Sequence, residues 1–189
     1  MSAEPLLAFR DVVAGYTGPV VGPVSFDLHP GDVLGLVGPN GCGKSTLIGA
    51  LTGASRLLSG EVVRGEGLSI AYQRQRPVRD TDVPLRGDEL LHLTRAGDSE
   101  PPESLRPLLK LRVDRLSGGQ FQLLNVWACL GGEARLIVLD EPTNNMDPSA
   151  VRALADLLHS ARNDRAVLVV THDARFLDGV SARILDVGR

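Results

Sequence analysis

The residues of this sequence best suited to chemistry form a glycine-rich stretch that follows a short apolar run. Residues 38–46 read Gly-Pro-Asn-Gly-Cys-Gly-Lys-Ser-Thr, which fits the pattern G-x-x-x-x-G-K-[ST], and residues 33–37 read Val-Leu-Gly-Leu-Val. Glycines without a Cβ let the backbone curl until successive N–H groups face one anion, and the following helix points its positive end at the same anion. The stretch is therefore predicted to bind the phosphates of a nucleotide.

Two residues at the end of this stretch carry its side-chain chemistry. The Lys44 ammonium is expected to reach the β- and γ-phosphates as a point charge, and the Ser45 hydroxyl to be one ligand of a hydrated magnesium ion. The residues predicted to contact the nucleotide here are Gly38, Asn40, Gly41, Cys42, Gly43, Lys44, Ser45 and Thr46.

Two acidic residues follow a second apolar run. Asp140 and Glu141 come directly after residues 136–139, which read Leu-Ile-Val-Leu. Asp140 suits the acidic partner of magnesium, acting through a bound water, and Glu141 is placed to orient and activate the water that attacks the terminal phosphate. Taken alone, such a pair is usually a solvated sheet edge, but a phosphate loop in the same chain favours a catalytic role.

A histidine and a tyrosine complete the candidate site. His172 follows an apolar run at 166–170 and is expected to bond the γ-phosphate from the other side, although a lone histidine after a strand is more often structural. Tyr16 lies on a predicted turn at 15–19, where its ring could stack on a nucleotide base. The alternative for Tyr16 is a surface tyrosine with no ligand.

The elements that must position these residues alternate between strands and helices. Buried strands at 33–37, 136–139 and 166–170 are each followed by a helical pattern, which predicts an α/β fold with a phosphate-loop core and a parallel-rich sheet. Ligands of such sheets bind outside the carboxyl ends of the strands, where all the polar motifs fall. Helices are predicted at 44–53, at 121–130, from Asp147-Pro148 onward and at 174–179, with a last strand at 182–187.

Three segments are predicted to lie outside this alternation. Residues 6–13 and 20–28 read as two strands of a small N-terminal antiparallel sheet beside the main one, and residues 60–72 look like a hairpin that returns a strand to the sheet. Residues 76–116 have no strand pattern and are predicted to form a short inserted helical subdomain. We expect residues 1–189 to form a single domain around this insertion.

Composition narrows the classes of protein to be considered. A net charge of −3 argues against nucleic acid as a partner, and 43% hydrophobic residues are ordinary for a globular chain. The two cysteines are far apart and are expected to be reduced thiols of a cytoplasmic protein. Because no apolar run approaches the roughly 18 residues needed to cross a bilayer, a role in transport would require a separate membrane subunit.

Residues 116–120, Leu-Ser-Gly-Gly-Gln, are the most specific mark in the chain. They resemble the signature sequence of the ATP-binding cassette (ABC) proteins, and the likeness to the nucleotide-binding domain of that family runs from about Leu6 to Val187. In that family two domains sandwich two ATP molecules, and each signature closes over the γ-phosphate held by the other domain. The resemblance implies an ATP-dependent homodimer in which Ser117, Gly118, Gly119 and Gln120 bind nucleotide. Backbone N–H groups at a helix start suit such an anion.

The resemblance also implies roles for the remaining site residues. Tyr16 matches the base-stacking loop, His172 the switch histidine, and residues 144–147 the aspartate loop. Gln75 matches the glutamine loop better than Gln73 does. Catalysis is thereby expected from Glu141, His172 and Gln75, and metal binding from Ser45, Gln75 and Asp140. The sequence departs from the family pattern at Arg74, where proline is usual, and at Leu123 and Ala128, where arginines are usual.

Two branches of the family compete. Residues 71–85 resemble ATPase subunits of zinc or manganese importers, which implies an ATPase that powers transport through an integral membrane permease and lies peripherally on the cytoplasmic face of the cell membrane. Residues 141–145 and 171–177 are instead similar to the soluble ABC-F translation factors, which act on the ribosome. Those proteins carry two cassettes and a charged linker, which this chain lacks. The basic residues Arg74, Arg76 and Arg79 could contact either partner.

Overall fold

The main sheet of the chain is parallel throughout. The structure is a computed structural model that describes residues 4–75, 84–97, 99–160 and 164–188. In this part of the chain, five strands pair in the order β5-β6-β7-β3-β8, and every pairing between neighbours is parallel. The strands are β3 (Val33–Val37), β5 (Ile70–Gln73), β6 (Leu136–Asp140), β7 (Ala166–Val170) and β8 (Arg183–Asp186). The predicted α/β fold with a parallel sheet is confirmed.

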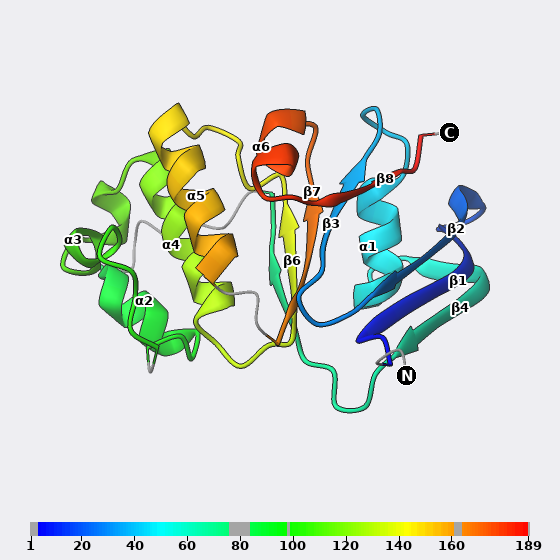
Figure 1. Cartoon of the computed structure of the whole chain (residues 1–189), viewed down its shortest axis with the longest axis horizontal. Helices are drawn as coiled ribbons and strands as arrows, with labels where there is room; N and C mark the ends of the chain where they lie inside the picture. The colour runs from blue at the N-terminus through cyan, green and yellow to red at the C-terminus, as the bar shows by residue number, and fades with distance from the viewer. Residues whose placement is uncertain (1–3, 76–83, 98, 161–163, 189) are drawn as a thin grey trace.

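The two faces of this sheet bury different sets of side chains. Successive residues of a strand point to opposite faces, so β6 and β7, which are buried along their whole length, contribute to two hydrophobic clusters. Ile137 and Leu139 belong to the cluster that includes residues of the later helices at 118–130 and 148–160. Leu136 and Val138 belong to the cluster that includes residues of α1 and the N-terminal strands. Figure 1 shows α1 lying between the main sheet and the second sheet.

The second sheet is antiparallel and has the strand order β2-β1-β4. Its strands are β1 (Leu7–Gly15), β2 (Pro19–Leu28) and β4 (Arg56–Arg64). The predicted N-terminal antiparallel sheet is confirmed, but the predicted hairpin at 60–72 is wrong. β4 pairs with β1, and β5 pairs with β6 in the other sheet, because the connection at 65–69 carries the chain from one sheet to the other.

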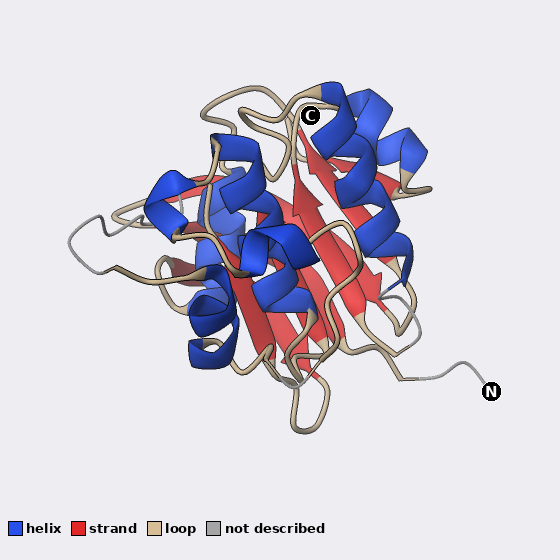
Figure 2. Cartoon of the chain, turned by 90° about the vertical axis from the view of Figure 1, so that its left-hand side faces the viewer, coloured by secondary structure: helices blue, strands red, loops and turns tan. Residues whose placement is uncertain are grey.

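Helices cover the faces of the main sheet. They are α1 (Lys44–Thr52), α2 (Gly87–Leu93), α3 (Arg106–Leu109), α4 (Gly118–Leu130), α5 (Pro148–Ser160) and α6 (Ala174–Gly179), with a 3₁₀ turn at Val113–Arg115. Figure 2 shows the helical side of the molecule in front of the sheet. α5 begins as predicted, because Asp147 Oδ1 accepts hydrogen bonds from the backbone N–H groups of Ser149 and Ala150. Among the described residues, every helix is too short or too polar to cross a lipid bilayer.

The described part of the predicted helical insertion contains α2 and α3. α2 packs on α4 and α3, and the two helices have seven and four residues. α2 ends at Leu93, and two residues later Arg95 adopts a left-handed backbone conformation with a φ of 59°. Residues 76–83, which include Arg76 and Arg79, lie outside the described residues. The limits of the insertion and the assignment of 1–189 to one domain stay predictions.

Candidate functional site

The glycine-rich loop joins the end of β3 to the start of α1. Gly43, the last residue before α1, has a φ of 101°, and a Cβ at this position would lie 2.5 Å from the Cβ of Val21. Both constraints require glycine, so the loop can close against β2 only with this residue type. The nine-residue helix α1 therefore starts at the loop itself, with its first-turn N–H groups available to an anion.

Lys44 is held across this loop. Its side chain is largely buried, and its Nζ donates to the carbonyl oxygens of Gly38 at 2.8 Å and Pro39 at 2.9 Å. Both hydrogen-bond partners are neutral carbonyls, so neither of them cancels the positive charge. The ammonium therefore stays attractive to a phosphate that enters the loop.

A cavity of about 210 Å³ brings the predicted residues of three segments together. It is lined by Asn40, Gly41, Gly43, Lys44, Ser45 and Thr46 of the loop and α1, by Gln75, by Asp140 and Glu141, and by Val20 and Val170. Gln75 lines this cavity, whereas Gln73 is buried elsewhere and its Nε2 donates to the Arg74 carbonyl. The cavity lies at the carboxyl ends of β5, β6 and β7, where a parallel sheet binds ligands.

Asp140 is buried and hydrogen-bonded to a tyrosine. The Tyr72 hydroxyl donates to Asp140 Oδ2 at 3.1 Å. Burial raises the pKa of Asp140 above its ordinary value, and the Glu141 charge adds to this, while the Tyr72 hydrogen bond and Lys44 oppose it. Burial, followed by the Asp140 charge, raises the pKa of Tyr72 to about 12, so the hydroxyl is a donor at neutral pH.

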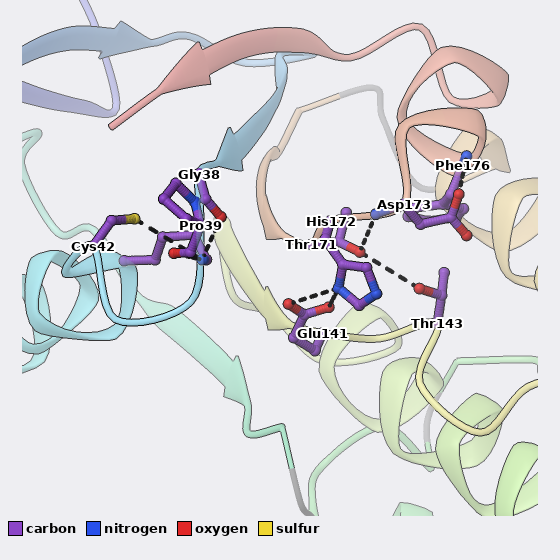
Figure 3. Close-up of polar contacts among 10 residues, drawn as sticks. Gly38, Pro39, Cys42, Glu141, Thr143, Thr171, His172, Asp173 and Phe176 are labelled. Atoms are coloured by element: carbon purple, nitrogen blue, oxygen red, sulfur yellow. Dashed lines mark hydrogen bonds and ion pairs between the residues drawn. The ribbon is translucent and has the colours of Figure 1, made fainter. Parts of the chain in front are cut away.

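Glu141 and His172 form the second polar contact of the site. His172 Nδ1 lies 3.0 Å from Oε2 and 3.2 Å from Oε1 of Glu141 (Figure 3). Glu141 adopts a left-handed conformation with a φ of 49°, and its N–H donates to the Val170 carbonyl at 2.7 Å. Left-handed backbone costs energy in a residue other than glycine and is concentrated at functional sites. It turns Glu141 off the end of β6 toward His172, the second residue after β7.

His172 belongs to a segment fixed by its own hydrogen bonds. Asp173 N donates to Thr171 Oγ1 at 3.1 Å, and Asp173 Oδ1 accepts from Phe176 N at 3.1 Å, which caps α6. Thr171 Oγ1 also lies 3.5 Å from Thr143 Oγ1 (Figure 3). The imidazole is 70% exposed, while the Glu141 side chain is only 9% exposed. The pair therefore presents a buried carboxylate behind an accessible ring.

The Leu-Ser-Gly-Gly-Gln segment caps α4. Gln120 N donates to Ser117 Oγ at 3.2 Å, and Ser117 N donates to Gln120 Oε1 at 2.9 Å, which is a reciprocal capping box. A Cβ on Gly119 would meet Met146 and Asn145 at ordinary contact distance, so this segment packs beside the loop before α5. The described residues that line the 210 Å³ cavity include none from 117–120.

Comparison with known proteins places this arrangement. The profile of a family described as ABC transporter matches residues 21–144. The chain is 38% identical to the zinc import ATP-binding protein ZnuC of Paracoccus denitrificans, over 96% of this chain and 75% of that protein. This chain belongs to the ABC transporter family. It is an ABC ATPase, and the resemblance inferred from residues 116–120 is confirmed.

Other relatives and solved structures agree with this family. ZnuC 1 of Hahella chejuensis is 32% identical over 100% of this chain and 77% of that protein, so this ABC chain spans about three quarters of the length of both relatives. An ATP-binding subunit of an ABC transporter superposes with a TM-score of 0.79 over 97% of this chain and 86% of that one, at 23% identity. A transporter assigned to the metal-chelate type, in an inward-facing conformation, gives 0.77 over 97% and 80%, at 25% identity.

In this ABC ATPase, one predicted site residue, Tyr16, lies outside the cavity, and one residue of the site, Tyr72, was not predicted. Tyr16 directly follows β1, is 55% exposed and does not line the cavity, so its stacking on a base stays a prediction. Tyr72 was missed. Its contact with Asp140 depends on the register between β5 and β6, and these strands are more than 60 residues apart in the chain. The only sequence signal was an aromatic residue three positions before Gln75.

Proposed function

We propose that this ABC ATPase is the energy-supplying subunit of a metal-ion importer, with zinc as the transported ion. The observation that carries the proposal is the 38% identity to a zinc import ATP-binding protein over 96% of this chain. The similarity to a transporter assigned to the metal-chelate type supports the same class. The subunit would lie on the cytoplasmic face of the membrane and act through a separate permease.

We propose that the cavity binds the phosphates and the magnesium ion of MgATP. We propose that the loop N–H groups and Lys44 hold the β- and γ-phosphates, and that Ser45, Gln75 and Asp140 face the magnesium ion. All three residues line the same cavity and offer oxygen atoms, which are the ligands that Mg²⁺ prefers, with water completing its shell. When bound, the ion neutralises charge that develops on the phosphates.

Glu141 is the residue best placed to act on the attacking water. Its carboxylate can accept a proton from a water that it orients. A carboxylate only accepts hydrogen bonds, so His172 Nδ1 carries the hydrogen in the contact shown. His172 would thereby hold the Glu141 carboxylate in place, while its exposed ring can meet the γ-phosphate.

A second copy of the chain is needed to complete the site in this proposal. The N-terminal end of α4, with Ser117, Gly118 and Gly119, does not line the cavity of its own chain, although its N–H groups and helix dipole suit a phosphate. In a two-fold homodimer, the capped α4 of one copy would close over the ATP held by the other.

The permease is proposed to dock beside Gln75. A groove of about 430 Å³ lies beside β5, the edge strand of the main sheet, and it is lined by Ala71, Tyr72, Gln73, Arg74, Thr94, Asn125, Ala128 and Cys129. Leu93, which ends α2 and precedes Thr94 in the sequence, is 71% exposed. An apolar groove with an arginine at its rim suits a partner helix that is apolar with an acidic end.

Leu123 and Ala128 stand on α4 at two positions where arginines are usual in the family. Both are buried in the apolar cluster, so α4 is anchored there by packing.

Uptake of zinc by intact cells tests this proposal. Cells whose own copy carries Glu141→Gln should lose energy-dependent uptake of radioactive zinc, because the variant binds ATP without hydrolysing it. Uptake of an unrelated solute, such as an amino acid, is the control and should be unchanged. Unimpaired zinc uptake together with loss of manganese uptake would assign manganese as the transported ion. Unimpaired uptake of both ions would contradict the importer proposal.

A further inference from the structure

Tyr72 connects two neighbouring strands at the edge of the nucleotide cavity. Tyr72 on β5 lies opposite Val138 on β6, and its hydroxyl reaches two residues further along β6 to Asp140 Oδ2 at 3.1 Å. Residues 138 and 140 point to the same face of β6 because side chains alternate along a strand. The ring packs against the apolar cluster that contains Val138. The ring is therefore fixed by packing, and its hydroxyl is fixed on the carboxylate.

Asp140 depends on an external contact for its orientation. The rotation of an aspartate carboxylate about its last bond is broad, so packing alone does not set the plane of its two oxygens. Asp140 is only 7% exposed, which limits the water that could hold it. In the described part of the chain, the side chain that donates to Asp140 is that of Tyr72. The hydrogen bond from Tyr72 thus occupies Oδ2 and fixes the direction in which Oδ1 points.

We propose that Tyr72 is a positioning residue that sets the orientation of the Asp140 carboxylate toward the metal ion of the ATP complex. The inference rests on the proposed function, in which Asp140 faces magnesium. Because β5 leads within three residues to Gln75, which lines the same cavity, the hydroxyl also fixes the Asp140 carboxylate relative to the Gln75 segment. Tyr72 acts through Asp140 and contacts neither phosphate nor metal.

The variant Tyr72→Phe removes the hydroxyl and keeps the ring that packs in the core. Mn²⁺, which reports metal binding by electron paramagnetic resonance, is titrated into the Glu141→Gln protein with saturating ATP. The dissociation constant of Mn²⁺ should rise about tenfold or more in Tyr72→Phe, the cost of one hydrogen bond to a charged group. The affinity for ATP measured in the presence of EDTA should stay unchanged, because the phosphate loop is untouched.

Two companion variants separate the possible outcomes. Ser69→Ala removes a hydroxyl that joins the same strands at their opposite end, where Ser69 Oγ donates to the Glu133 carbonyl at 3.4 Å and accepts from Arg135 N at 3.3 Å. This control should bind Mn²⁺ like the parent protein. Asp140→Asn tests the carboxylate itself and should weaken Mn²⁺ binding more than Tyr72→Phe does.

Each alternative result has a definite meaning. If Asp140→Asn weakens Mn²⁺ binding and Tyr72→Phe does not, the positioning role of Tyr72 is wrong and the metal site stands. If neither variant changes Mn²⁺ binding, the proposed metal role of Asp140 fails. An equal loss in Ser69→Ala would assign the effect to strand pairing in general and would also overturn the role of Tyr72. Thermal unfolding without metal verifies that all three variants are folded.

Discussion

His172 Nδ1 lies 3.0 Å from Oε2 of Glu141, so the residue directly after β6 meets the second residue after β7. Each residue comes from the carboxyl end of a buried parallel strand, and the left-handed backbone at Glu141 turns its carboxylate toward the neighbouring strand end. Through this contact, an exposed histidine holds the orientation of the proposed catalytic carboxylate. The contact also gives that histidine a role that can be tested apart from nucleotide binding.

Binding and turnover should separate between Lys44 and Glu141. Glu141→Gln should bind MgATP normally and lose about 10²- to 10⁴-fold in kcat, because it removes only the group that activates water. Lys44→Ala should instead weaken ATP binding by about tenfold or more, since it removes a charge aimed at the phosphates. Isothermal titration and steady-state phosphate release measure the two effects. Full turnover in Glu141→Gln would remove this residue from the catalytic role.

His172→Ala should lower kcat by about tenfold or more and leave the affinity for ATP within about twofold of the wild type. The reason is that the variant releases the Glu141 carboxylate without touching the phosphate loop. His159→Ala is a matched control, because His159 is an exposed histidine on α5 whose Nδ1 contacts the Ala155 carbonyl. Equal rates in His172→Ala and the wild type would show that the contact has no part in hydrolysis.

Asp140→Asn should stabilise the protein at neutral pH in the absence of metal. The folded-state pKa of Asp140 is raised, so its contribution to stability is fully present below the unfolded value near 3.8 and is lost as the pH rises through the folded value. The neutral amide avoids this loss and should raise the melting temperature at pH 7 by about 2 °C or more. The difference should shrink as the pH is lowered toward 3.8.

Asp147 provides a comparison of opposite sign. Its hydrogen bonds from Ser149 and Ala150 lower its pKa, so its stabilisation is present above about 3.8 and is lost as the pH falls through its folded value. Asp147→Ala should therefore lower the melting temperature at pH 7. A fall in melting temperature for Asp140→Asn under the same conditions would show that burial does not penalise the Asp140 charge.

Much of the fold could be predicted from the sequence because its signals are local. Gly53 ends α1 in a left-handed conformation, and Asp147 caps α5, and each depends on residues within one helical turn. The hairpin at 60–72 was wrong because the pattern of a strand does not say which sheet it joins. The contact between Tyr72 and Asp140 was missed for a related reason, since it depends on the register of β5 against β6.

The site followed the same division. The sequence placed Asp140 and Glu141 at the carboxyl edge of a parallel sheet, and the family resemblance added Gln75; all three line one cavity. It did not predict that His172 would contact Glu141, because the turn of the backbone at Glu141 depends on its hydrogen bond to Val170.

Dimer formation should depend on ATP and on the N-terminal end of α4. Glu141→Gln should sediment as a monomer without nucleotide and as a dimer with ATP, because bound ATP joins the copies and is not hydrolysed. Adding Ser117→Arg should keep it monomeric by filling the space for the partner's γ-phosphate. Ser69→Arg, at the opposite end of the sheet, is the control and should still dimerise. A monomer in all conditions at high protein concentration would contradict the proposed assembly.

Identifying the cellular fraction that binds the ATPase tests most directly the claim that it is an importer subunit. Cells expressing tagged Glu141→Gln are broken in the presence of ATP, and membranes are separated from ribosomes by sedimentation through a density gradient. We predict that the tagged protein is recovered with the membranes, together with a multi-span membrane protein that co-purifies on the tag. Recovery with ribosomes and none with membranes would contradict the importer account and favour a translation factor.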